Sequence, residues 1–165
     1  KLWAAQPDSF QGEHVVTALR LLKKHVSRPD GGHPKHRALV AAMADHLHVN
    51  GEFFAAPAVV EAAFLLEEVQ HRSLNVLMVS RRHLAQLKHN RLHLGLDHVA
   101  MALWTQVFAG THLTHRVCLA VEREFGSSER RGEVKDPRTL PRLIWALARA
   151  KRWRYTVFED LQEAL

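Results

Sequence analysis

Basic side chains grouped with an aromatic ring are the residues of this chain whose types and spacing favour a defined chemistry. The densest group consists of Arg149, Lys151, Arg152, Trp153 and Arg154. Lysine and arginine neutralise phosphates and release their counterions, and a ring beside arginine can stack on an unpaired base. We therefore predict that this group binds RNA. Two alternatives stay open: the segment is a solvated turn, or Trp153 covers the end of a helical hairpin.

Three further basic groups are predicted to extend the RNA-binding surface. They are Lys23, Lys24 and Arg37; Arg81, Arg82, Lys88 and Arg91; and Arg130, Arg131, Lys135 and Arg138. Arg130, Arg131 and Lys135 lie within the polar Gly/Ser segment 126–135, and Arg138 follows it. We expect this segment to become ordered on RNA. Phosphate contacts of this kind position a protein without reading base sequence. For each group, a solvated surface that binds nothing is the alternative.

The positive charge is concentrated in the second half of the chain. The 165 residues carry a formal net charge of +6. Residues 1–80 contain 8 Lys/Arg and 8 Asp/Glu, whereas residues 81–165 contain 15 Lys/Arg and 9 Asp/Glu. The whole excess therefore lies after residue 80. A basic half favours a polyanionic partner, and charge composition alone does not distinguish RNA from DNA or anionic lipid.

Catalytic and metal-binding patterns are weak in this sequence. It contains no Gly-rich phosphate loop, no nucleophile elbow and no His-Glu-x-x-His run, so we expect a non-enzymatic protein without a cofactor, metal or small-molecule substrate. His89 and His93 are interpreted as structural or surface histidines, because zinc would need two further ligands nearby. The single cysteine, Cys118, lies in an apolar stripe and is predicted to be a buried structural thiol.

Helices must position these side chains, because apolar residues recur at helical spacing and no segment alternates apolar with polar residues. Four apolar stretches align from Val16, Val60, Val99 and Leu140 at nearly equal steps along the chain. Four more segments end in register at Leu47, Leu84, Phe125 and Leu165. A period of about 40 residues is typical of a solenoid of helix pairs, whose function resides on an extended surface and not in a pocket.

We predict an all-α, solenoid-like array of about four antiparallel helical hairpins within a single domain, 1–165. The expected hairpins span 9–47, 57–88, 98–125 and 138–165. Asp97 is expected to cap the helix that begins at residue 98. Trp104 and Trp145 lie in apolar stripes and are expected to pack in the core. An irregular helical bundle is the alternative architecture.

The last hairpin contains the segments Leu140-Pro-Arg-Leu-Ile-Trp-Ala-Leu-Ala-Arg-Ala-Lys151 and Tyr155-Thr-Val-Phe158. These residues resemble the octotricopeptide and heptatricopeptide (FASTK-type) helical repeats of organellar proteins, which carry an aliphatic–Leu–Trp–Ala–Leu–Ala core. In 99–109, Trp104 takes the tryptophan position, but Thr-Gln-Val replaces Ala-Leu-Ala. The first two hairpins lack the tryptophan.

This resemblance implies an organellar protein that acts on RNA in the mitochondrial matrix or, alternatively, in the chloroplast stroma. Some proteins of the wider class are subunits of organellar ribosomes, and four repeats are few for a factor that reads sequence. We therefore expect a subunit of an organellar ribonucleoprotein, first of all a mitochondrial ribosome, that contacts rRNA and neighbouring proteins. The rivals are a protein–protein scaffold or accessory subunit of another organelle complex, and a stand-alone RNA maturation or stability factor.

Two features concern targeting. The chain lacks an apolar run of the length that a membrane-spanning helix needs, so no membrane span is expected. The chain begins at Lys1 and not at methionine, and we expect a processed or truncated product whose targeting peptide lies outside this sequence.

Overall fold

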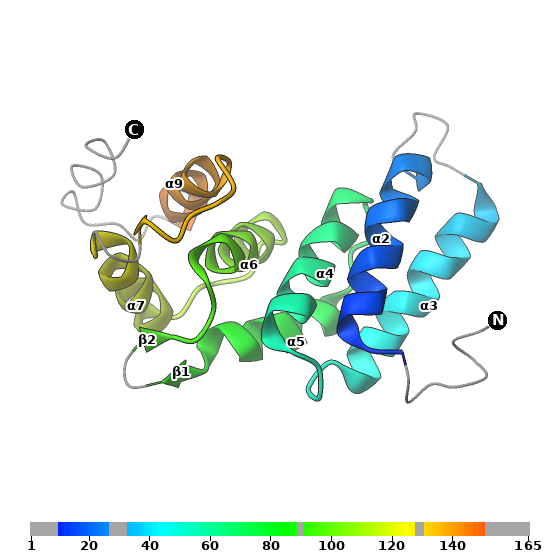
Figure 1. Cartoon of the computed structure of the whole chain (residues 1–165), viewed down its shortest axis with the longest axis horizontal. Coiled ribbons are helices and arrows are strands. Elements are labelled where there is room, and N and C mark those ends of the chain that lie inside the picture. The colour runs from blue at the N-terminus through cyan, green and yellow to red at the C-terminus, as the bar shows by residue number, and fades with distance from the viewer. Residues whose placement is uncertain (1–9, 27–32, 89–90, 128–130, 151–165) are drawn as a thin grey trace. The chain divides into compact units, whose positions relative to one another are not determined.

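The computed structural model describes residues 10–26, 33–88, 91–127 and 131–150, and these residues are predominantly helical (Figure 1). Seven helices occur in that part of the chain, so the predicted all-α fold class is confirmed. The chain divides into two compact units, Lys1–Ser80 and Arg81–Leu165. The helix α5, Leu74–Ala85, runs across the boundary between the two units.

The first unit contains α2 (Gly12–Val26), α3 (Pro34–Asn50), α4 (Ala56–Glu68) and the first part of α5. Pro34 and Pro57 lie in the first turns of α3 and α4, where a missing N–H costs no helical hydrogen bond. The ring of His33 caps α3 by accepting a hydrogen bond from the backbone N–H of Lys35. The helices α2, α3 and α4 lie side by side (Figure 1).

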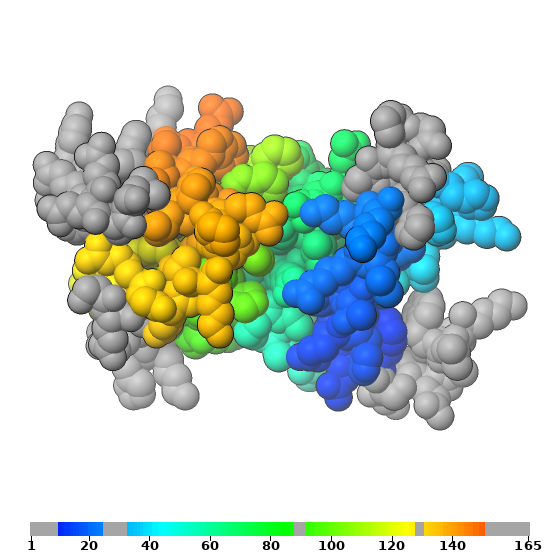
Figure 2. Space-filling view, turned by 45° about the horizontal axis from the view of Figure 1, so that its top comes forward, coloured from blue at the N-terminus to red at the C-terminus, as the bar shows by residue number. Residues whose placement is uncertain are grey.

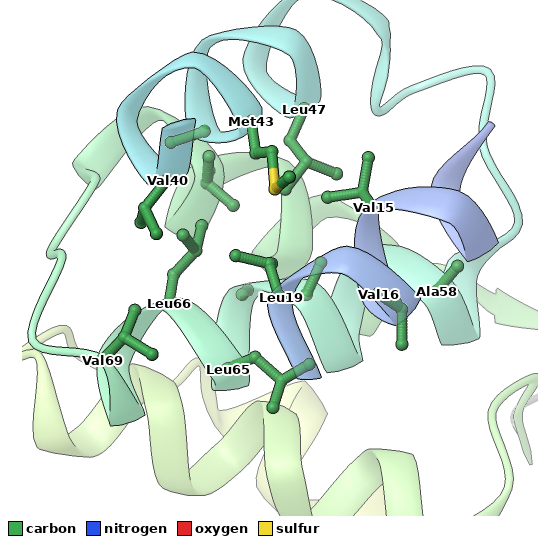
Figure 3. Packing of buried hydrophobic residues seen from close by; sticks show 14 residues of the cluster. Val15, Val16, Leu19, Val40, Met43, Leu47, Ala58, Leu65, Leu66 and Val69 are labelled. Carbon is green, nitrogen blue, oxygen red and sulfur yellow. The ribbon is translucent and has the colours of Figure 1, made fainter. Parts of the chain in front are cut away.

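The core of the first unit forms where α2 packs against α4 and, less extensively, against α3. Leu19 of α2, Met43 of α3 and Leu66 of α4 are buried in the same apolar cluster (Figure 3). Gly12 allows this close packing, because a Cβ at that position would lie 2.9 Å from the Cβ of Ala58. The apolar faces of these three helices therefore pack against one another.

His46 fastens the chain before α2 to the end of α3. Its Nε2–H donates a 2.9 Å hydrogen bond to the carbonyl oxygen of Phe10, and its Nδ1 accepts from the side-chain amide of Asn50. Its ring also lies against the rings of Phe10 and Phe54. This buried histidine therefore has a structural role.

The second unit begins with the last part of α5, which is followed by a short antiparallel ladder and three further described helices. The ladder joins β1 (Leu87–Lys88) to β2 (Arg91–Leu92), and the helices are α6 (Leu96–Phe108), α7 (His115–Gly126) and α9 (Thr139–Ala150). The helix α6 packs most extensively against α9, and α7 contacts both α6 and β2. Leu103 of α6 and Leu143 of α9 are fully buried, so the two helices share one core.

The ladder corrects one expectation. The helix predicted to continue to residue 88 ends at Ala85, and Lys88 instead pairs with Arg91 across two very short strands. The buried side chain of Glu124 in α7 accepts a 3.3 Å hydrogen bond from the backbone N–H of Leu92. Glu124 is distant in sequence from β2 and helps to hold this strand. The local sequence of 85–92 therefore does not predict this hydrogen bond.

The helices α4 and α6 end in the same way. Gln70 and Gly110 both have left-handed backbone, with φ of 59° and 78°. In each case the next residue donates its N–H back to the helix: His71 to the carbonyl of Leu66, and Thr111 to that of Gln106, both at 2.9 Å. This arrangement satisfies carbonyls that the helix end leaves exposed.

The aligned positions of the second helices share their burial. The three terminal residues within the described ranges, Leu47, Leu84 and Phe125, are all buried. The positions four residues earlier, Met43, Ser80 and Val121, are buried as well, as are Val40, Leu77 and Cys118 three residues before those. The predicted buried thiol at Cys118 is thus confirmed. In the fourth predicted hairpin the corresponding positions are Phe158, Leu161 and Leu165, and these lie outside the described residues.

Candidate nucleic-acid interface

The densest basic group is described only at its first member. Arg149 is exposed in the last turn of α9, where a cation interacts favourably with the helix dipole. Lys151, Arg152, Trp153 and Arg154 lie outside the described residues, as does Arg130. The RNA-binding role predicted for these residues stays a prediction.

One member of the first basic group, Lys23, forms an ion pair within the first unit. The ammonium of Lys23 lies 2.8 Å from Glu68 Oε2 of α4, and one turn earlier Arg20 pairs with Glu61. Ion pairs at this exposure contribute at most about 1 kcal/mol each. They nevertheless direct these cations toward α4. Lys24 and Arg37 are exposed.

The second group spans the end of α5 and the ladder. Arg81 and Arg82 are exposed in the last turns of α5. Lys88 and Arg91 are partners in the ladder, and their side chains lie outside the described part of the structure.

Asp97 is hydrogen-bonded to the segment that carries the third basic group. It lies inside the first turn of α6, because the helix begins at Leu96 with Gly95 at the N-cap position. The predicted capping role is therefore wrong. Its carboxylate instead accepts hydrogen bonds from the backbone N–H groups of Lys135 and Asp136, at 3.2 and 3.4 Å, and from the hydroxyl of Thr139 at 2.5 Å. The chain before α9 is thus tied to the start of α6.

Asp136 holds two arginines next to this point. Its Oδ1 accepts from the backbone N–H and Nε of Arg138, and its Oδ2 accepts from Nη1 of Arg142 at 2.7 Å. Burial alone would raise the pKa of Asp136, but the bonds from Arg138 and Arg142 and the charge of Arg142 outweigh it. The pKa falls from 3.8 to about 2. Asp136 is therefore ionised at neutral pH and fixes both guanidinium groups.

Cations and acids of the second unit differ in exposure. Among the nine described cationic side chains from residue 81 onward, Arg131 and Arg142 are half-buried and seven are exposed: Arg81, Arg82, Arg116, Arg123, Lys135, Arg138 and Arg149. Among the five acids described over the same residues, Glu133 alone is exposed, while Asp97, Glu122, Glu124 and Asp136 are buried or half-buried. The folded second unit consequently presents mainly positive charge to its surroundings. Residues 131–138 and α9, gold to orange in Figure 2, contribute to this surface.

Three aromatic rings form a cluster on α6 and α9. Trp104 and Phe108 are stacked with ring centroids 4.7 Å apart, and Trp145 lies 6.0 Å from Trp104 and 6.4 Å from Phe108. Trp104 is half-buried, whereas Trp145 is 40% exposed and Phe108 is 47% exposed. The expectation that Trp145 packs in the core is therefore wrong. Leu143, Ala146 and Leu147 turn a different side of α9 inward and are buried.

The described histidines do not converge on a metal. Within residues 10–26, 33–88, 91–127 and 131–150, no group of three or more potential metal ligands occurs. His93, one of the pair singled out by spacing, is hydrogen-bonded through Nδ1 to the carbonyl of Gln86 at 2.8 Å. A membrane-spanning helix would need a longer apolar stretch than any helix within these ranges provides.

Comparisons with known proteins identify no relative. No protein-family model, no curated protein and no solved structure matches this chain.

Proposed function

We propose that this chain is a non-enzymatic, RNA-associated helical-repeat subunit of an organellar ribonucleoprotein, first of all a mitochondrial ribosome. The observation that carries the proposal is the exposure difference in the second unit, where seven of nine described cations are exposed and one of five described acids is. Exposed cations attract a polyanion and neutralise its phosphates. Structured RNA hides its base edges in a deep major groove, so contacts to phosphate and overall shape are expected.

The proposed repeat has support from the local structure within each unit. The first helices of consecutive hairpins pack on each other, α2 on α4 and α6 on α9. The polar contacts between them join residues separated by nearly one period, such as Arg20 with Glu61 and Asp97 with Thr139. The matching ends of α4 and α6, at Gln70 and Gly110, are spaced by the same interval. An array of this kind offers an extended surface for a large partner.

The first unit is suited to protein neighbours. Its exposed large apolar side chains include Leu21, Val49, Phe53 and Met78, and Phe53 is 88% exposed. Residues 1–80 also carry equal numbers of cationic and acidic side chains. These features favour protein contact over phosphate contact in this half. They equally support the alternative of a protein–protein scaffold, in which the basic second unit would meet an acidic protein.

Salt-dependent RNA binding tests the proposal. The full chain is titrated with a structured rRNA fragment at salt concentrations from about 50 to 300 mM, chosen because phosphate contacts weaken steeply over this range. The Arg81→Ala/Arg82→Ala variant should lower the affinity and reduce the salt slope by about one to two. The control is Arg20→Ala/Lys35→Ala, which removes two charges from the first unit and should leave the slope unchanged.

Two results would overturn the proposal: affinity that does not respond to salt, or equal losses in both double variants. Sedimentation from an organelle lysate separates the scaffold alternative. A ribonucleoprotein subunit should travel with a large particle and leave it after ribonuclease treatment, whereas a scaffold should stay with its protein partners.

A further inference from the structure

Basic and aromatic residues alternate along one side of α9. Arg138, immediately before the helix, is followed by Arg142, Trp145 and Arg149 at steps of four, three and four residues. Such steps place side chains one above another on a helix surface. We call these four residues the α9 stripe. It extends about 16 Å along the helix axis, given a rise of about 1.5 Å for each residue.

The aromatic member of the α9 stripe offers a partly open ring surface. Trp145 is 40% exposed although it contacts two other rings, and Phe108, its neighbour on α6, is 47% exposed. Trp104 stacks nearly parallel on Phe108, with 9° between the two rings, and supports it from within the helix. The ring of Trp145 is therefore held at the surface by aromatic neighbours.

The arginines of the α9 stripe are partly pre-positioned. Asp136 accepts hydrogen bonds from both Arg138 and Arg142, which fixes these guanidinium groups on one side of Trp145. Arg138 still exposes 69% of its side chain. Arg149 is exposed one turn beyond Trp145 on the other side. Three arginines are set against the half-buried carboxylates of Asp136 and the adjacent Asp97, so the stripe has a small excess of positive charge. Its exposed cations, Arg138 and Arg149, lie on opposite sides of the ring.

We propose that the α9 stripe binds an unpaired segment of RNA, with one nucleobase stacked on Trp145 and the neighbouring phosphates at Arg138 and Arg149. This inference rests on the proposed function and deepens it, because it adds a second stacking site to a surface on which Trp153 is the predicted stacking ring. An apolar ring flanked by cations complements a planar base flanked by anions. Stacking is tolerant of sequence, because every base has a π-face, so the site favours unpaired nucleotides of any sequence.

A comparison of base-bearing and abasic strands isolates the stacking contact. The full chain is titrated with a decamer of adenylate and with an abasic decamer of the same phosphate number, at one salt concentration. The wild-type chain should bind the adenylate strand about tenfold more tightly, within the range that stacking of one base supplies. Trp145→Ala should remove this preference, whereas Trp145→Phe should retain most of it. Arg149→Glu should weaken binding of both strands.

A matched variant in the first unit controls for loss of any exposed aromatic ring. Phe53→Ala should leave the preference unchanged, because Phe53 lies outside the α9 stripe. Circular dichroism checks that each variant keeps its helices. Because Trp153 is also a predicted stacking ring, the preference is assigned to Trp145 only if Trp145→Ala removes it while its helices are retained. A Trp145→Ala variant that is folded and keeps the preference would overturn the inference.

The outcomes separate this inference from the function on which it rests. If structured RNA binds in a salt-dependent way but the two decamers bind equally, the α9 stripe makes no stacking contact and only this inference is overturned. If no RNA binds at all, both proposals fail. A third outcome would identify an acidic-peptide site. In that case the two decamers bind equally, and polyglutamate competes with the adenylate strand as effectively as abasic RNA of equal charge does.

Discussion

The hydroxyl of Thr139, the first residue of α9, donates a hydrogen bond to Oδ1 of Asp97 in the first turn of α6, with 2.5 Å between the two oxygens. Thr139 is fully buried, and the same carboxylate also accepts two backbone N–H groups from the segment before α9. One side chain therefore fixes the relative position of two helices that are far apart in the sequence.

We expect Asp97→Ala to lower the free energy of unfolding by about 2 to 3 kcal/mol, because it leaves a buried hydroxyl and two backbone donors without their acceptor. Urea denaturation measures the change. Asp45→Ala, which removes an exposed acid from α3, is the matched control and should change stability by less than about 0.5 kcal/mol. Equal effects of the two substitutions would contradict the role assigned to Asp97.

Asp136 should make stability depend on pH in the acid range. Its folded-state pKa of about 2 lies below the unfolded value of 3.8, so the unfolded chain binds the proton more readily. The stabilisation is fully present above about pH 4 and is lost as the pH falls toward 2. After allowance for solvent screening it is on the order of 1 kcal/mol. Denaturation of wild type and Asp136→Asn from pH 5 to pH 2 should show the two stabilities converging on acidification, and parallel curves would refute this assignment.

Leu19 and Leu21 lie two residues apart on α2 and should respond very differently to truncation. Leu19 is fully buried in the first unit, so Leu19→Ala should cost about 2 to 5 kcal/mol through lost burial and a residual cavity. Leu21 is 63% exposed, and Leu21→Ala should change stability by about 0.5 kcal/mol or less. Thermal or urea unfolding of the two variants checks the orientation of α2, and similar losses would mean that α2 is rotated.

The matching ends of α4 and α6 lead to opposite predictions for glycine. Gln70 has φ of 59°, which costs a residue with a Cβ about 1 kcal/mol or more, so Gln70→Gly should be stabilising or neutral. Gly110→Ala should destabilise by about 1 kcal/mol through the backbone alone, because a Cβ there would meet nothing within 4 Å. Unfolding midpoints measure both changes. A stabilising Gly110→Ala would show that Gly110 is not left-handed.

Leu143 and Trp145 report which side of α9 faces the core. We expect Leu143→Ala to cost about 2 to 5 kcal/mol, since Leu143 is fully buried. Trp145→Ala should cost about 1 to 2 kcal/mol despite the larger ring, because only part of that ring is removed from water. A larger loss of stability for Trp145→Ala than for Leu143→Ala would mean that Trp145, and not Leu143, faces the core.

The positions of the helices could be predicted because they depend on local signals. Pro57 suits the first turn of α4, Gly110 suits the end of α6, and the apolar spacing within each helix marks the face that becomes buried. The residues of the short ladder carry no such signal. They are held by long-range partners, of which Glu124 is one, and such partners cannot be read from a single segment.

The site was less predictable for the same reason. Asp97 precedes an apolar run and resembles a capping residue, but the helix starts at Leu96, two residues earlier than predicted. The carboxylate of Asp97 instead reaches Thr139 of the next predicted hairpin. The spacing of Arg138, Arg142, Trp145 and Arg149 was visible in the sequence. The exposure of Trp145 was not, because Leu143 and Trp145 both belong to apolar patterns and only the packed structure shows which of them is covered.

The extensive packing of α6 on α9, and not on the adjacent α7, has a consequence for synthesis. Ribosomes make a chain from its N-terminus, and α6 is complete at Phe108 whereas its main partner begins at Thr139. During translation the nascent chain therefore holds an apolar helix without its main packing partner until α9 emerges. Intermediates of this kind are prone to aggregate, so production of this protein should benefit from holdase chaperones, whereas slow elongation between α6 and α9 would prolong the exposed state.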